Sequence, residues 1–246
     1  MPIYHAVAQR SPEWFALRLG IPCSSEFAKI ITPKTTKPSA QSKLLMYRLL
    51  AEWMTGAKVE IADDIENFES QAMNRGVELE DSACAAYEML TDTETQPGGF
   101  VTTDDGMIGC SPDRLVGDVG DLELKCPLIQ TQVGYALGAG VDEKYMAQIQ
   151  GRMMITGREW VDIFAFHPRL TIPPIRVQRD EKYIATMRPI LVEFVALMLE
   201  KRAELERRFG PFLRAEPPDE PPDHSADFVT DADVEMILDA QREKPE

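Results

Sequence analysis

The chain of 246 residues is long enough to bury a sizeable core, and its 44% hydrophobic and 27% charged residues are typical of a globular protein. Its net charge of −15 disfavours a surface that is basic throughout, and no run of about 18 apolar residues predicts a membrane span. The amino terminus, MPIYHAVAQRSPEW, lacks the basic and apolar segments of a secretion signal, so we expect a soluble cytoplasmic protein.

The first half of the chain is expected to be largely helical. After an opening loop, short helices are predicted near residues 11–19 and from about residue 24. The segment 41–56 places Leu45, Leu49 and Trp53 at helical spacing and stops at Gly56, a favourable helix terminus. A second long helix is predicted over 70–90.

The second half mixes strands with helices. The β-like runs GGFVTT, GMIGC and DRLVG precede LELKC, which suggests a hairpin or meander. A helix over 145–157 ends at a glycine, EWVDIFAFH and PIRVQRD are predicted strands, and a long helix over 182–208 is expected to be interrupted at Pro189. The pattern predicts one mixed α/β domain over residues 1–214.

The carboxyl end differs in composition. Residues 215–246 hold 11 acidic and two basic side chains, a net charge of −9, whereas the preceding residues carry only −6. We predict an acidic, proline-rich linker, EPPDEPPDH, followed by a short helix after Thr230 that is either a docking peptide or a frayed tail. A locally positive cleft in the preceding domain would be compatible with an acidic total.

The four cysteines and three histidines do not predict a zinc site. The cysteines lack CxxC spacing, and no histidine has a cysteine or histidine at metal-ligand spacing. We expect the cysteines to be reduced and structural.

The stretch SPDRLVGDVGDLELKCP concentrates two carboxylates and a lysine within a few residues. In LELKC the side chains alternate, so Glu123 and Lys125 share one face of a strand. If the preceding segment pairs antiparallel through the turn at Gly117 to Gly120, Asp113 lies across from them. Two carboxylates with a free carbonyl, such as that of Leu124, would suit Mg²⁺ or Mn²⁺.

This pattern has an ordinary alternative. A glutamate and a lysine two residues apart on a strand usually form a solvated face with a weak ion pair. Taken alone, the local spacing favours that alternative.

Motifs over most of the chain favour the functional interpretation. The sequence resembles phage lambda exonuclease and the YqaJ-type alkaline exonucleases, a branch of the PD-(D/E)XK nucleases. The resemblance lies in the following motifs, in family order: LRLG (17–20) with Ser25-Glu26, RGVELE (75–80), CSPDRL (110–115), LELKCP (122–127), YMAQIQ (145–150) and RDEKY (179–183). It implies a restriction-endonuclease-like mixed sheet flanked by helices.

The resemblance also implies roles for particular residues. Asp113 and Glu123 match metal-binding carboxylates, with the Leu124 carbonyl as a third ligand, and Lys125 matches the catalytic lysine. Glu80 matches an acidic residue that helps to hold the metal and its water, directly or through water. Its rival Glu78 faces about 200° away on the same helix, so we choose Glu80 and expect Glu78 to face solvent.

Four further residues fall where the resemblance implies recognition of a 5′-phosphate. They are Arg18, Ser25, Ser111 and Gln148. A guanidinium fork binds phosphate through two bonds, and hydroxyl and amide donors complete such a pocket. Each of them alone is more often structural.

The implied activity is Mg²⁺-dependent 5′ to 3′ hydrolysis of one strand of linear duplex DNA, which leaves a 3′ single-stranded tail; Mn²⁺ is an alternative metal. The family further implies a homotrimeric ring and a single-strand annealing protein as partner, with no membrane association. Two rival functions remain: a structure- or end-dependent endonuclease, and a non-catalytic DNA-end binding protein. Closed circular DNA separates the first rival from an exonuclease.

Overall fold

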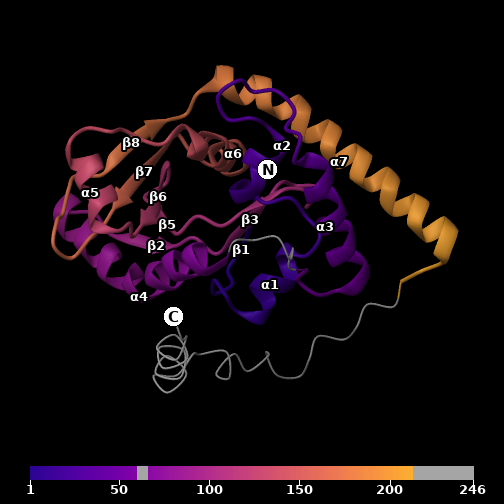
Figure 1. Cartoon of the computed structure of the whole chain (residues 1–246), viewed down its shortest axis with the longest axis horizontal. Helices are drawn as coiled ribbons and strands as arrows, with labels where there is room; N and C mark the ends of the chain where they lie inside the picture. The colour runs from indigo at the N-terminus through magenta and orange to yellow at the C-terminus, as the bar shows by residue number, and fades with distance from the viewer. Residues whose placement is uncertain (60–65, 213–246) are drawn as a thin grey trace, which may run out of the picture. The chain divides into compact units, whose positions relative to one another are not determined.

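The computed structural model describes residues 1–59 and 66–212, with side chains omitted for 66–74. A five-stranded mixed sheet is its centre, in the order β2 (Thr95–Pro97), β5 (Arg114–Val116), β6 (Gly120–Lys125), β7 (Trp160–Ala165) and β8 (Ile175–Gln178). Strands β6 and β7 are parallel, whereas the other neighbours are antiparallel. The predicted mixed sheet flanked by helices is therefore present (Figure 1).

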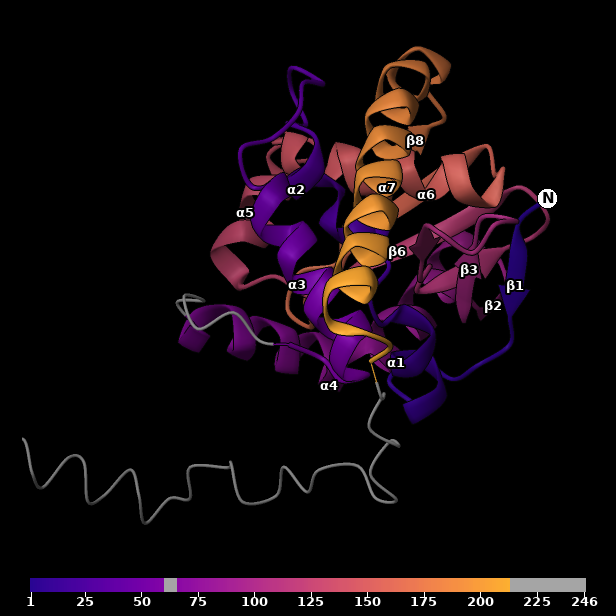
Figure 2. The same cartoon turned by 90° about the vertical axis from the view of Figure 1, so that its right-hand side faces the viewer.

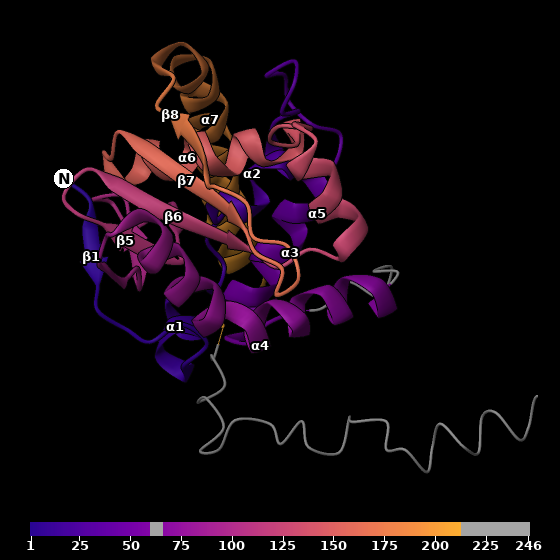
Figure 3. The same cartoon turned by 90° about the vertical axis from the view of Figure 1, so that its left-hand side faces the viewer.

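One face of this sheet is covered by α4 (Glu66–Thr91), the second long helix expected from the sequence. Ala83 and Tyr87 of α4 pack in an apolar cluster with Leu122 of β6 and Phe164 of β7. These strand residues occupy alternate positions, as a sheet requires of side chains that share a face. Figure 3 shows α4 running beside the sheet.

The opposite face is covered by α6 (Met146–Thr156), which is buried along most of its length. Ile149 and Met153 of α6 pack on Val161 and Ile163 of β7. A Cβ atom on Gly151 would lie 2.3 Å from the Phe27 ring, so this glycine is what lets α6 approach the neighbouring helix closely. The helix is thereby fixed between the sheet and the rest of the core.

A second helical layer adjoins α6. It contains α2 (Phe27–Ile30), α3 (Ser42–Thr55) and α7 (Glu181–Phe209), whose apolar faces share the largest core cluster. Helix α3 ends at Gly56 with φ 69°, the left-handed terminus predicted from the sequence. Figures 1 and 2 show α7 running beside α3 as a long rod.

A small antiparallel sheet completes the fold. Its order is β1 (Ile3–His5), β3 (Phe100–Thr102) and β4 (Gly109–Cys110). The predicted strand run is therefore divided, because GGFVTT and GMIGC enter this sheet while DRLVG and LELKC enter the central one. The short elements α1 (Pro12–Arg18), 3₁₀ turns at Ser24–Glu26 and Glu143–Tyr145, and α5 (Ile129–Ala136) connect these layers.

Two sequence predictions are wrong in detail. The opening loop contains β1, whose three residues are too short for a periodicity to be read but pair with β3. The long helix is not interrupted at Pro189, which lies inside α7. Buried residues on both sides of the proline, among them Met187 and Leu191, anchor the helix on the core across that position.

The predicted boundary at residue 215 and the acidic segment beyond it lie outside the described residues. Within the described part, no helix combines the length and apolar character needed to cross a bilayer.

Candidate active site

The hairpin of β5 and β6 brings the predicted carboxylates together. Its register pairs Arg114 with Leu122, so Asp113 comes opposite Glu123 at the next position along the strands. Asp113 Oδ2 accepts a hydrogen bond of 2.7 Å from the backbone N–H of Leu124. The antiparallel arrangement expected from the turn is thus confirmed, and the Asp113 side chain is fixed against β6.

Glu123 accepts more side-chain hydrogen bonds than Asp113, and it is only 4% exposed. Its Oε1 accepts from Lys125 Nζ at 2.5 Å and from Gln148 Nε2 at 3.0 Å. Its Oε2 accepts from Arg152 Nη2. The predicted sharing of one strand face by Glu123 and Lys125 is confirmed.

The pKa values of Asp113 and Glu123 shift in opposite directions. Burial raises the pKa of Asp113, and the negative charge of Glu123 raises it further. Burial alone would also raise the pKa of Glu123, but the adjacent Arg152 and Lys125 outweigh it and hold that pKa well below its usual range. Burial would lower the pKa of Lys125, yet Glu123 beside it raises the value, so the lysine stands as an ammonium at neutral pH.

The donor set fits a hard divalent cation. Asp113 uses Oδ2 for its bond to Leu124, which leaves Oδ1 for a ligand. Among the described residues no three His, Cys, Asp or Glu side chains gather as a metal cluster. Asp113, Glu123 and the Leu124 carbonyl remain the candidate ligand set predicted from the sequence, and Mg²⁺ commonly completes such a set with water.

Glu80 lies on α4 and is paired elsewhere. Its Oε2 accepts from Arg10 Nη2 at 2.6 Å, an ion pair in which Arg10 adopts the left-handed φ of 66° that few residues other than glycine take. Glu78 is exposed, as expected for the rejected rival. The role assigned to Glu80 stays a prediction.

Two of the predicted phosphate-binding residues meet directly. Arg18 Nη1 donates to Ser111 Oγ at 2.9 Å, and Trp14 Nε1 donates to the same oxygen at 3.0 Å. The Arg18 guanidinium lies 4.2 Å from the centre of the Trp14 ring, a cation–π contact that orients the fork. Ser25 is exposed in the turn Ser24–Glu26.

Gln148 joins the carboxylates, where its amide bonds Glu123. The sequence placed it with Arg18 and Ser111 as a phosphate contact. The structure therefore links Gln148 to Glu123, while its proposed phosphate contact stays a prediction.

Sequence reasoning missed three side chains of this site. Asp121 is fully buried and lies on the face of β6 that carries Glu123, while Arg152 follows Gln148 by one helical turn on α6. Tyr145 places its ring centre 4.9 Å from Lys125 Nζ. Two signals were present: the two-residue spacing from Asp121 to Glu123, and the four-residue spacing from Gln148 to Arg152.

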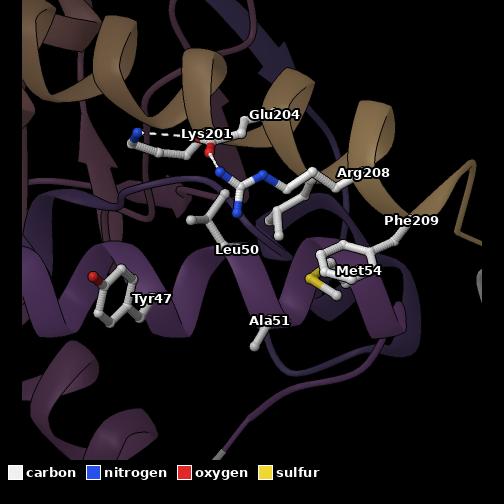
Figure 4. A pocket seen from close by; sticks show the side chains of 9 residues that line it. Tyr47, Leu50, Ala51, Met54, Lys201, Glu204, Arg208 and Phe209 are labelled. Atoms are coloured by element: carbon white, nitrogen blue, oxygen red, sulfur yellow. Dashed lines mark hydrogen bonds and ion pairs between the residues drawn. The ribbon is translucent and has the colours of Figure 1, made fainter.

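Two cavities, of about 310 and 390 Å³, lie away from the carboxylates. Both line the seam between α3 and α7 and share Tyr47 and Lys201. Figure 4 shows the smaller one, with Leu50 and Met54 of α3 facing Arg208 and Phe209 of α7. No predicted site residue lines either cavity.

The part of the chain that contains the candidate site is similar to known proteins. Residues 13–159 match the YqaJ-like viral recombinase domain. Two structures of the alkaline exonuclease LHK-Exo from Laribacter hongkongensis, the second in complex with dAMP, give TM-scores of 0.70 and 0.69 at 30% and 31% identity, covering 80% of this chain and 97% of theirs. No curated protein shows a significant match.

A more distant structure supports the fold alone. A phage-related exonuclease from Haemophilus somnus 129PT gives a TM-score of 0.56 at 16% identity, covering 75% of this chain and 96% of its own. The predicted restriction-endonuclease-like class is confirmed by these neighbours together with the observed mixed sheet. The family match spans more than half of the sequence, and the chain belongs to the YqaJ-like viral recombinase domain family.

Proposed function

We propose that the chain is a metal-dependent exonuclease that hydrolyses one strand of linear duplex DNA from its 5′ end and leaves a 3′ single-stranded tail. The observation that carries this proposal is the meeting of Asp113, Glu123 and Lys125 at the β5–β6 hairpin, in a chain similar to an alkaline exonuclease. One structure of that relative is a complex with dAMP, a deoxynucleoside monophosphate.

Asp113, Glu123 and the Leu124 carbonyl would hold Mg²⁺, for which Mn²⁺ would substitute. When bound, such an ion polarises a phosphoryl oxygen and lowers the pKa of its water. The protein supplies one buried carboxylate, Glu123, and one partly buried carboxylate, Asp113.

Lys125 contributes a positive charge beside the scissile phosphate. Because its pKa is raised by Glu123, the ammonium orients the attacking water and offsets charge that develops on phosphoryl oxygens; it does not begin as a free base. The Tyr145 ring lies 4.9 Å from the ammonium and offers it a cation–π contact.

The Arg18 and Ser111 pair would bind the terminal 5′-phosphate. Ser111 precedes Asp113 by two residues, a span of roughly 7 Å in extended chain. That span is comparable to the separation of adjacent phosphates on a strand. A phosphate held at Arg18 would therefore place the next phosphodiester near Asp113 and Glu123.

The family resemblance extends the proposal to assembly. A homotrimeric ring around linear DNA would retain its substrate topologically, so an acidic protein need not bind phosphates tightly everywhere. The 3′ tail would be received by a single-strand annealing protein.

A digestion time course tests the function. Linear duplex labelled at the 5′ or the 3′ end of one strand is incubated with Mg²⁺ or with chelator, beside closed circular duplex of the same sequence. We expect 5′ label to be released first as mononucleotide, only with Mg²⁺, and the circle to stay intact. Loss of the circle would favour an endonuclease, and binding of DNA ends without any hydrolysis would favour the non-catalytic alternative.

A further inference from the structure

A buried arginine on α6 lies beneath the candidate carboxylates. Arg152 is 1% exposed. Its Nη1 donates to Asp121 Oδ1 at 3.3 Å and to the Leu122 carbonyl at 3.4 Å, and its Nη2 donates to Glu123 Oε2. The two branches of one guanidinium therefore bind two carboxylates of the same strand.

This spacing suits arginine and no other side chain. Asp121 and Glu123 point to the same side of β6, roughly 7 Å apart along the strand. A planar fork can bond both carboxylates at once, whereas a lysine offers a single ammonium at the end of a flexible stem. Substitution by lysine would thus preserve the charge but lose the geometry.

Arg152 is shared between two carboxylates. Asp121 and Glu123 are buried and both bond its guanidinium, and the other cations that act on them are Lys125 at Glu123 and Arg158 at Asp121. Asp121 Oδ2 is buried and lacks a hydrogen-bond partner in the described structure. Because Asp121 shares the positive charge of Arg152, Glu123 keeps part of its own negative charge for another cation.

The three residues that bond Glu123 do not all use the same carboxylate oxygen. Lys125 and Gln148 both bond Oε1. Arg152 holds Oε2 from within the core. When Lys125 turns toward a phosphate, Arg152 still fixes the rotation of the Glu123 carboxylate.

We propose that Arg152 is a positioning residue: it fixes the orientation of Glu123, and its charge, shared with Asp121, sets the affinity of the site for a divalent cation. This inference rests on the proposed nuclease function. It assigns to Asp121 the role of a counter-ion that stops Arg152 from neutralising Glu123.

The test compares Arg152→Lys with Arg158→Lys in the full-length protein. Arg158 is the matched control because it is also buried and supports the start of β6, where its guanidinium donates to the carbonyls of Gly117 and Gly120. Three quantities are measured: Mn²⁺ affinity by calorimetry, the melting temperature, and single-turnover cleavage of linear duplex at saturating Mg²⁺.

We expect Arg152→Lys to weaken Mn²⁺ binding about tenfold and to slow single-turnover cleavage about 100-fold, without changing the DNA concentration that gives half-maximal rate, because a misplacement of about 1 Å has that effect on rate. Arg158→Lys should lower only the melting temperature. Equal Mn²⁺ affinities and cleavage rates for wild type and both variants would overturn the proposal and leave Arg152 as a structural ion pair.

A second variant covers the case in which Arg152→Lys does not fold. Asp121→Asn leaves the Arg152 charge entirely to Glu123, so Mn²⁺ binding should weaken about tenfold and the Mg²⁺ concentration that gives half-maximal cleavage should rise by a similar factor. Unchanged Mn²⁺ affinity in Asp121→Asn would contradict the charge-sharing role. If wild type itself neither binds Mn²⁺ nor cleaves DNA, the proposed function fails, which is a separate outcome.

Discussion

The two faces of strand β6 are both buried, yet they carry opposite chemistry. Leu122, on the face covered by α4, is fully buried among apolar side chains. Asp121 and Glu123, on the face covered by α6, are 0% and 4% exposed and are charged. Neighbouring residues of one strand thus differ in chemistry but not in burial.

The two faces differ in what burial costs. Burying an apolar side chain stabilises the fold, whereas removing a carboxylate from water costs several kcal/mol unless partners offset it. Arg152 and Lys125 partly offset that cost for Glu123. A carboxylate whose pKa is raised by burial and by a charged neighbour, such as Asp113, is therefore a candidate functional residue.

The largest effect should come from Asp113→Asn. Asparagine can still accept the hydrogen bond from Leu124, so the fold should persist, but the anionic ligand is lost. We expect hydrolysis of linear duplex to fall by about 10³-fold or more, with melting temperature unchanged or raised.

Asp118→Asn, in the exposed turn of the same hairpin, is the control and should retain full activity. Comparable rates for the two variants would show that the charged face is not the reactive one.

Leu122→Ala, on the face covered by α4, should lower stability and leave cleavage intact. Truncating a fully buried leucine costs about 2–5 kcal/mol of unfolding free energy. We expect this loss in chemical denaturation, with single-turnover cleavage near wild type at a temperature where the variant stays folded. A variant that is stable but inactive would mean that the two faces are not separable.

Substitution of Arg18 should have a smaller effect on the cleavage rate, and the effect should depend on whether the substrate carries a 5′-phosphate. Wild type should digest 5′-phosphorylated duplex about 10-fold to 100-fold faster than the 5′-hydroxyl form, and Arg18→Ala should lose most of that preference. Arg18→Lys should recover only part of it, because an ammonium cannot make the two parallel bonds of the fork. The preference is measured as the ratio of initial rates on the two substrates at one fixed salt concentration. If Arg18→Ala is slower on both substrates but keeps the preference, the 5′-phosphate is bound by other residues.

The smallest effect is expected for Tyr87→Phe on the α4 face. The Tyr87 hydroxyl donates to buried Asp162 at 2.8 Å, but Arg176 also bonds both oxygens of that carboxylate. We expect a loss of about 1 kcal/mol in unfolding free energy and no change in cleavage. A large loss of activity would implicate this face in the reaction.

Much of the fold and part of the site could be predicted from local patterns. Helical spacing and the terminal glycine identified α3, and strand alternation placed Glu123 and Lys125 on one face. The turn at Gly117 to Gly120 gave the register that brings Asp113 opposite Glu123. These features depend on residues close together in sequence.

The features that could not be predicted from the sequence depend on contacts between residues that are far apart in the chain. Strands β1 and β2 have three residues each and acquire their structure from partners elsewhere in the chain. The contact between Arg152 and Glu123 joins residues 29 positions apart, and a lone arginine on a helix otherwise resembles a surface charge. Pro189 was misread because packing along α7 outweighs the local preference of proline.

The most direct test follows mononucleotide release from linear duplex by wild type and Lys125→Ala, each with Mg²⁺ and after chelation, with DNA binding measured in parallel. We expect rapid Mg²⁺-dependent release from the 5′ end by wild type, and release slower by orders of magnitude from Lys125→Ala at equal DNA binding. Near-normal release by Lys125→Ala, or release by wild type without a divalent cation, would contradict this expectation.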